Sequence, residues 1–213
     1  MLDEPLNPVE IRILGCLIEK QHATPEYYPL TLNALVAACN QTTNREPVMA
    51  LGEGEIAAGL EALRHKRLVW FVAGAGSRTT KYEQKLSEDL NLALQEVAAL
   101  AVLMLRGPQT AGEIRSRAGR LYAFADLGEV EAALESLCTA EPPLALKLPR
   151  QPGTKESRFA HLLAGAPEIE LPPMELPAHG PTRVEQLQAE VALLREELRG
   201  LREEFQAFRR ELG

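Results

Sequence analysis

Basic side chains in predicted loops and turns are the residues of this sequence whose chemistry points most clearly to a ligand. Arginine and lysine bind phosphate oxygens through charge-assisted hydrogen bonds, which position a protein on DNA without reading its bases. Each of these cations could also be an ordinary solvated side chain, so contact with the DNA backbone is a hypothesis here. The candidate residues are Arg45, Arg78, Lys81, Arg115, Arg117, Arg120, Lys155 and Arg158.

The sequence contains no arrangement of residues that is typical of an active site or a metal centre. Its 4 histidines fall in separate predicted elements, and none stands beside a plausible nucleophile. Its 3 cysteines lack the spacing of a zinc site, and their odd number favours buried thiols in a reducing compartment over disulfides. The glycine-rich run at 73–80 has strand-like sequence on both sides, whereas a phosphate-binding loop joins a strand to a helix. We therefore expect a non-enzymatic protein with no metal and no cofactor.

One short pattern occurs twice in the chain. Gly54–Leu63 (GEIAAGLEAL) recurs as Gly128–Leu137 (GEVEAALESL) at a constant offset of 74 residues. Strand-like sequence and a turn follow each copy, and the turns contain Gly76 and Gly153. The repeat indicates two copies of one small domain.

In each copy the spacing of apolar residues predicts three helices followed by a two-stranded hairpin, the order of a winged helix-turn-helix. Asn7, Thr31, Thr110 and Asp126 are the predicted N-caps. The first copy should contain helices over about 8–20, 32–40 and 53–66 and strands over 68–72 and 79–84. The second should contain a helix over about 94–106, helices opened by Thr110 and Asp126, and strands near 144–148 and 157–162. Arg115, Arg117 and Arg120 fall on the second helix of this copy.

The predicted fold class is mainly α with small β-hairpins, an α+β chain in which two tandem winged-helix domains precede a C-terminal coiled-coil helix. A stretch rich in proline separates the second domain from that helix and is predicted to be an extended linker. The predicted parts are 1–86 and 87–163 for the domains, 164–183 for the linker and 184–212 for the coiled coil.

The C-terminal segment has an apolar residue at alternating spacings of three and four, which is an a/d heptad pattern. Glutamates at g positions and arginines five residues later at e positions would pair in a parallel homodimer, whereas an antiparallel pair would bring like charges together. We therefore expect a parallel homodimer, and a helix that folds onto its own domains is the alternative. The seam residues are Val184, Leu187, Val191, Leu194, Leu198, Leu201, Phe205, Phe208 and Leu212.

The charge of the chain argues against base reading by the third helix of either copy. The formal net charge is −7, the opposite of the basic balance usual in a free-standing nucleic-acid binder. The third helices carry glutamates where recognition helices use arginine, lysine, asparagine or glutamine. DNA contact would therefore depend on wing and loop cations that meet the backbone. The alternative function is a protein–protein interaction adaptor that uses the winged helices as docking surfaces. The glutamates are Glu53, Glu55, Glu61, Glu129, Glu131 and Glu135.

The N-terminus and the hydropathy of the chain bear on its location. The first ten residues, MLDEPLNPVE, are acidic and contain proline, so they do not form a signal peptide. No apolar run approaches the ~18 residues that a membrane helix needs. We expect a cytoplasmic protein with no membrane contact.

The stretch from Leu14 to Met49 resembles the signature of the YceH family, bacterial proteins with two tandem winged-helix domains and often a C-terminal coiled coil. The resemblance implies the fold and no activity. Thr42 stands where we expect the family often to carry lysine, which removes one cation from this loop. The matching residues include Glu19-Lys20, Tyr28-Pro29-Leu30, Ala38-Cys39-Asn40-Gln41 and Asn44-Arg45-Glu46-Pro47-Val48-Met49.

Within this signature we expect Arg45 to be structural, because asparagine and proline fix the turn around it. Its guanidinium should pair with a carboxylate or donate to a carbonyl of a neighbouring element. Contact with a partner or a phosphate is the alternative role.

Overall fold

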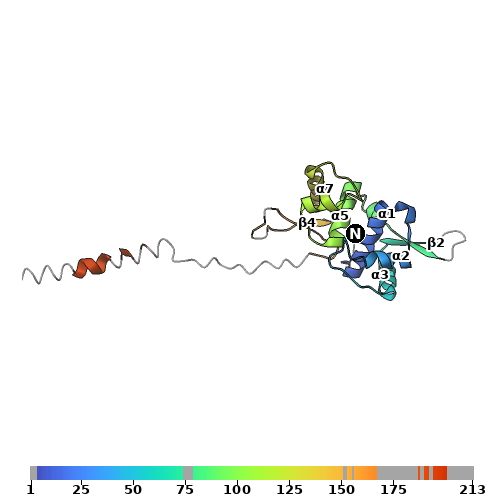
Figure 1. Cartoon of the computed structure of the whole chain (residues 1–213), viewed down its shortest axis with the longest axis horizontal. Helices are drawn as coiled ribbons and strands as arrows, with labels where there is room; N and C mark the ends of the chain where they lie inside the picture. The colour runs from blue at the N-terminus through green and yellow to red at the C-terminus, as the bar shows by residue number, and fades with distance from the viewer. Residues whose placement is uncertain are drawn as a thin grey trace, which may run out of the picture. The chain divides into compact units, whose positions relative to one another are not determined.

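The computed structural model describes residues 4–73, 79–150, 153, 154, 156–166, 187, 190, 191 and 194–200. The chain divides into two compact units, one up to residue 167 and one from residue 168. The first unit consists of α-helices with small antiparallel sheets, which confirms the α+β class (Figure 1).

The first half of this unit begins with three α-helices. They are α1 (Pro8–Ala23), α2 (Leu32–Cys39) and α3 (Glu53–His65), and a short 3-10 helix, η1 (Pro25–Tyr27), follows α1. The predicted N-cap of α1 is confirmed. The side-chain oxygen of Asn7 accepts from the amides of Val9 and Glu10, and the Glu10 carboxylate accepts from the Asn7 amide at 2.8 Å.

A three-stranded antiparallel sheet follows these helices. Its strands are β1 (Leu30–Thr31), β2 (Val69–Ala73) and β3 (Thr80–Gln84), in the order β1-β3-β2. The predicted hairpin is therefore present and gains β1 as a third strand, because the backbone of Thr31 pairs with Lys81. The hydroxyl of Thr31 also accepts from the amide of Ala34, so this residue serves both the sheet and the cap of α2.

The second half repeats the order of elements. It contains α4 (Leu86–Asp89), α5 (Leu94–Arg106), α6 (Ala111–Arg117), α7 (Leu127–Thr139), β4 (Ala145–Lys147) and β5 (Phe159–His161). Thr110 caps α6 as predicted, in a capping box with Glu113, and Asp126 caps α7. One expectation is corrected here. Because α6 ends at Arg117, Arg120 lies in the turn that follows and not on the helix.

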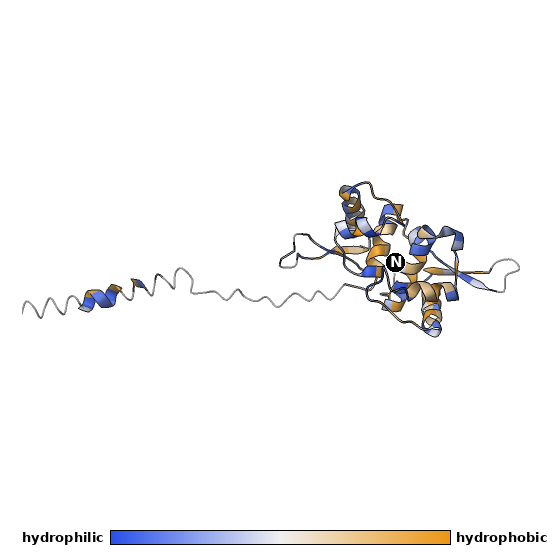
Figure 2. Ribbon diagram, in the orientation of Figure 1, coloured by the Kyte–Doolittle hydropathy of each residue, from blue (hydrophilic) through white to orange (hydrophobic). Residues whose placement is uncertain are grey.

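The two halves share one hydrophobic core, in which α1 packs against α5. Helix α5 is apolar around its whole circumference and is buried from Val97 to Leu105. Gly15 permits the close approach of α1, because a Cβ atom there would lie 2.8 Å from the side chain of Leu105. Figure 2 shows the hydrophobic residues concentrated on these inner helices. Sharing one core suits two copies that are each small for an independent domain.

The two hairpins lie on opposite sides of the helical core (Figure 1). The hairpin β2–β3 extends from one side, and β4–β5 extends from the other. The third helices α3 and α7, which precede these hairpins, therefore belong to different faces of the unit.

The second unit is described only at residues 187, 190, 191 and 194–200, and these residues are helical. The apolar side chains on the predicted seam are exposed, namely Leu187, Val191, Leu194 and Leu198. The remaining seam residues Val184, Leu201, Phe205, Phe208 and Leu212 lie outside the described residues, as does most of the predicted linker.

Candidate functional site

A cleft of about 790 Å³ lies where the two halves of the first unit meet. The C-terminal ends of α1, α2, α5 and α6 all reach it, together with the loops that follow α2 and α6. The loop after α2 is Asn40–Asn44, part of the polar stretch that the sequence marks out between the second and third helices. The repeat thus places equivalent helix ends around one cavity.

Arg45 supports this loop from beneath the surface. It is 3% exposed, and its guanidinium donates to both carboxylate oxygens of Glu19, at 3.2 and 2.6 Å. It also donates to the carbonyls of Ala38 and Asn44 and to the side-chain oxygen of Gln41. Pairing with a carboxylate and with carbonyls is confirmed. Because the guanidinium is buried and has its partners within the protein, Arg45 does not belong to a surface that could meet phosphates.

Electrostatics keep this pair ionised. Burial alone would lower the pKa of Arg45 and raise that of Glu19, but the hydrogen-bonded ion pair outweighs burial in both. The pKa of Arg45 is therefore raised and that of Glu19 lowered.

A second buried arginine, Arg12 of α1, was not predicted to have a role. Its guanidinium donates to the carbonyl of Cys39 at 3.0 Å and to that of Pro47 at 2.6 Å. The Asn40 side chain holds the other end of the same loop by two hydrogen bonds to the backbone of Leu51. In sequence, Arg12 is a single cation among apolar residues, a pattern that also fits a solvated position, so only the tertiary contacts reveal its function.

Four cations line the cleft, and they have few partners. Arg106 donates to the Asn44 side chain at 2.7 Å, Lys20 lies 3.4 Å from Glu19, and Arg117 lies 3.7 Å from Glu113. Arg120 is exposed, and no ion pair with another described residue engages it. The pKa of Arg106 is lowered, first by partial burial and then by the positive charge of Arg117. Positive side chains are therefore concentrated in the cleft.

The other predicted phosphate contacts are dispersed. Arg115 lies on α6 outside the cleft and donates to the carbonyl of Ala125 at 2.8 Å. Arg158 donates to the carbonyl of Pro108 and pairs with Glu113 at 3.1 Å. Lys81 is exposed on β3. Arg78 and Lys155 lie outside the described residues. The structure thus brings together Arg117 and Arg120 at the cleft, with Arg115 nearby on α6. The other candidate cations that the structure describes lie elsewhere.

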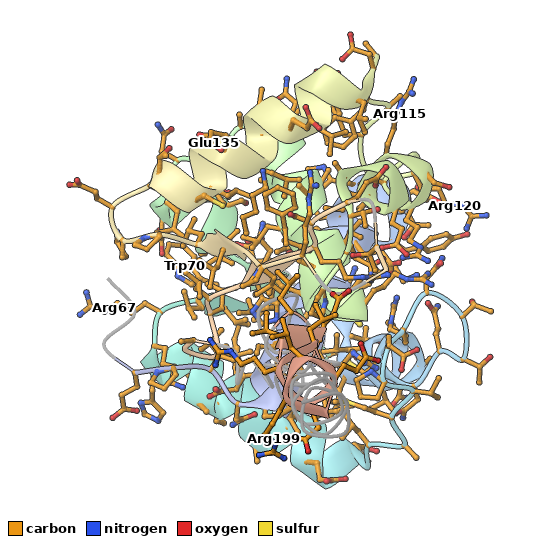
Figure 3. The ribbon with its side chains drawn as sticks, turned by 90° about the vertical axis from the view of Figure 1, so that its left-hand side faces the viewer. Arg67, Trp70, Arg115, Arg120, Glu135 and Arg199 are labelled. Carbon is orange, nitrogen blue, oxygen red and sulfur yellow. The ribbon has the colours of Figure 1, made fainter. Side chains whose placement is uncertain are left out.

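The acidic character of the third helices is confirmed. Glu53, Glu55 and Glu61 are exposed on α3, and Glu131 and Glu135 are exposed on α7. Figure 3 shows Glu135 on α7, while Arg115 and Arg120 project at the right-hand edge of that view.

Glu129 differs from the other α7 glutamates because its carboxylate is held within the protein. It accepts from the Tyr122 hydroxyl at 2.6 Å and from the Ala125 amide at 2.8 Å. These contacts lower the pKa of Glu129, the Tyr122 hydroxyl more than the amide. Glu129 therefore ties the loop before α7 to that helix.

A second hollow, of about 470 Å³, lies between α7 and the hairpin β4–β5. Its lining combines exposed Leu127 with the carboxylates of Glu131 and Glu135 and the cations Lys147 and Arg150. The carboxylates in this lining make the hollow unsuited to phosphates.

Two further findings concern the part of the chain that the structure describes. There, no set of three histidine, cysteine, aspartate or glutamate side chains is arranged to hold a metal ion. No helix in the same part combines the length and the apolar composition that crossing a membrane requires.

Comparison with known proteins places this architecture in a family. Residues 6–154 match the family model described as "Protein of unknown function, DUF480". The chain belongs to the DUF480 family. The matched residues include both halves of the first unit as far as β4, and with them the whole cleft.

Relatives of this DUF480 protein extend over most of its length. A UPF0502 protein of Geobacter sulfurreducens is 52% identical, with 89% of this chain and 90% of the relative covered. A UPF0502 protein of Chromobacterium violaceum is 53% identical, with 89% and 87% covered. One of Azoarcus sp. is 50% identical, with 97% and 93% covered. These matches agree with the resemblance to the YceH family.

Proposed function

We propose that this DUF480 protein is a non-enzymatic, regulator-like protein of two tandem winged-helix domains that contacts the DNA backbone. The order of elements supports the winged-helix assignment, since the three longer helices of each half, α1–α3 and α5–α7, are followed by a hairpin. In the second half, Gln109 pairs with Phe159 as Leu30 pairs with Tyr82 in the first, so both halves place a short extended segment beside the hairpin. The threonines that follow, Thr31 and Thr110, cap the second helix of each half.

The observation that carries the DNA proposal is the arginine cluster at the end of α6. Arg115, Arg117 and Arg120 lie within six residues of sequence, in a chain whose formal net charge is −7. Arg115 and Arg120 are exposed, and Arg117 is partly exposed. A local concentration of arginines on an otherwise acidic protein favours contact with phosphates at this one surface over contact with phosphates across the whole protein. We call Arg115, Arg117 and Arg120 the α6 cluster.

The third helices have a different role in this proposal. Their exposed glutamates would repel phosphates at the edges of a major groove, and α3 and α7 belong to different faces of the unit. The protein would therefore bind the sugar–phosphate backbone of DNA and would contact few bases. The cations of the first hairpin, Arg78 and Lys81, would add a weaker contact of the same kind.

The proposal includes a parallel homodimer through the C-terminal helix. The exposed Leu187, Val191, Leu194 and Leu198 support it, because apolar seam residues of a coiled coil become buried only against a partner helix. Two copies would double the number of arginine clusters available to one duplex.

Charge reversal separates the surfaces that could contact DNA. Arg115→Glu with Arg120→Glu should weaken binding of a duplex of any sequence, measured by fluorescence anisotropy at ~50 mM salt. Arg78→Glu with Lys81→Glu changes the net charge by the same amount on the first hairpin and serves as the matched control. We expect the α6 variant to lose more affinity than this control. Equal affinity of the α6 variant and the wild type would remove the cluster from the proposal.

A protein–protein interaction adaptor is the second candidate, and the hollow between α7 and β4–β5 favours it. Exposed Leu127 beside Glu131 and Glu135 offers an apolar contact with acidic neighbours, which suits a protein segment better than DNA. Absence of duplex binding at ~50 mM salt would favour this function. Leu127→Asp should then reduce the capture of a partner in a pull-down.

A further inference from the structure

The cleft between the two halves has the size and lining of a site for a small organic ligand. Its volume of about 790 Å³ falls in the range of small-molecule pockets. Val102, Leu105 and Leu121 provide apolar surface in it, while Thr42 and Thr43 provide hydroxyl groups. A bare ion would leave most of this cavity to water, whereas a molecule with an apolar body would use the lining as well.

The charges of the lining favour an anion. Lys20, Arg106, Arg117 and Arg120 contribute four positive charges, and Glu19 is the one acidic side chain among the described lining residues. The Glu19 carboxylate is already paired with Arg45 at 2.6 Å and with Lys20 at 3.4 Å. The lining side chains therefore carry an excess of positive charge, of which Lys20 is paired with Glu19 and Arg117 with Glu113 outside the lining.

Arg106 has a guanidinium whose hydrogen bonds are only partly satisfied by the protein. Its Nε is buried and has no hydrogen-bond partner, while its Nη1 is held by the side chain of Asn44 at 2.7 Å. A buried donor without a partner is destabilising. The nearby charge of Arg117 lowers the pKa of Arg106, and Glu46 and Glu113 oppose that effect. Lys20, Arg106 and Arg117 also complement the carbonyl ends of their own helices, but that role needs no acceptor at the Nε of Arg106.

We propose that this cleft binds a small phosphorylated organic molecule of about nucleotide size, with Arg106, Arg117 and Arg120 holding its phosphate. Arginine suits this group because its planar guanidinium can donate two hydrogen bonds to one phosphate. The site goes beyond DNA contact, but it shares Arg117 and Arg120 with the α6 cluster, so a duplex bound to that cluster and the ligand would compete for these two arginines. The same phosphate chemistry could come from a nucleic-acid backbone, so the test includes both sources.

The test is calorimetric titration of the full chain with adenosine monophosphate, inorganic phosphate and adenosine. We expect the monophosphate to bind and adenosine to bind at least about tenfold more weakly, since it lacks the phosphate. Arg117→Gln with Arg120→Gln should weaken binding of the monophosphate by about tenfold or more. Arg115→Gln is the matched control on the same helix outside the cleft and should bind as the wild type does.

One control distinguishes an effect on folding from an effect on binding, and the other tests competition by DNA. Arg106→Lys retains the charge but removes the guanidinium fork, so it should weaken monophosphate binding while the circular dichroism spectrum stays native. A short DNA duplex that binds the α6 cluster should compete with the monophosphate on the wild type, because both would use Arg117 and Arg120.

Two results would overturn the proposal: no heat of binding for the monophosphate or phosphate at about 10 mM, or equal affinity for adenosine. Neither result depends on whether the protein binds DNA.

Discussion

Arg45 shows how a residue singled out by its sequence context can support a site without contacting a ligand. Its guanidinium joins Glu19 of α1 to the carbonyl of Ala38 in α2, and thereby fixes the loop that borders the cleft. The polar run around it predicted a turn and a pairing partner. Which carboxylate it meets could not be predicted, because Glu19 is 26 residues away in sequence and α1 has a second glutamate, Glu10.

Removing this guanidinium should destabilise the fold. Arg45→Ala leaves Glu19 partly buried without its partner, at a cost on the order of 3 kcal/mol. We expect a clear fall in the midpoint of chemical denaturation, and Arg115→Ala, which removes an exposed arginine, should leave that midpoint almost unchanged. An Arg45→Ala protein that is as stable as the wild type, but binds DNA more weakly, would show that Arg45 contacts the ligand.

His161 on β5 makes stability depend on pH. Burial lowers its pKa to about 4, and its Nδ1 has no hydrogen-bond partner. The unfolded chain, with a histidine pKa near 6.5, binds more protons than the folded chain between these values. Stability from the neutral imidazole is therefore complete above about pH 6.5 and is lost as pH falls toward 4. At pH 5 the loss is about 2 kcal/mol.

Replacing the imidazole tests this dependence. His161→Gln should flatten the decline in stability between pH 7 and pH 5, as measured by urea denaturation at each pH. An equally steep decline in the variant would assign the effect to other groups.

At the scale of elements, local signals predicted the helix starts well. Asn7, Thr31, Thr110 and Asp126 all cap helices, because a cap depends on residues within one turn of it. Strand β1 was not predicted, since its two residues become a strand only by pairing with β3, about 50 residues away. The cleft was not predicted for the same reason: its lining comes from four helix ends that only the packing of α1 on α5 brings together.

The contact between α1 and α5 can be tested at Gly15. A Cβ there would lie 2.8 Å from Leu105, so Gly15→Ala should cost about 1–3 kcal/mol despite the better helix propensity of alanine. Gly54→Ala is the matched control, because its Cβ would meet no atom within 4 Å on α3. That variant should be stabilised by up to about 1 kcal/mol. Thermal melts compare the two, and a stabilised Gly15→Ala would contradict the close packing.

At the scale of the whole molecule, the C-terminal helix should set the oligomeric state. Leu194 and Leu198 are exposed in the single chain, and a second copy would bury them. Leu194→Lys with Leu198→Lys places like charges across the seam, so sedimentation should show a monomer with unchanged circular dichroism from the first unit. A wild type that is already monomeric at micromolar concentrations would indicate an intramolecular contact or a different partner.

The central claim is that the α6 cluster binds the DNA backbone, and the salt dependence of duplex binding tests it most directly. Each phosphate contact contributes about −0.9 to the slope of log affinity against log salt. We predict a steep slope for the wild type and a slope shallower by about 2 for Arg115→Glu with Arg120→Glu. No binding at ~50 mM salt, or the same slope in both proteins, would contradict the claim.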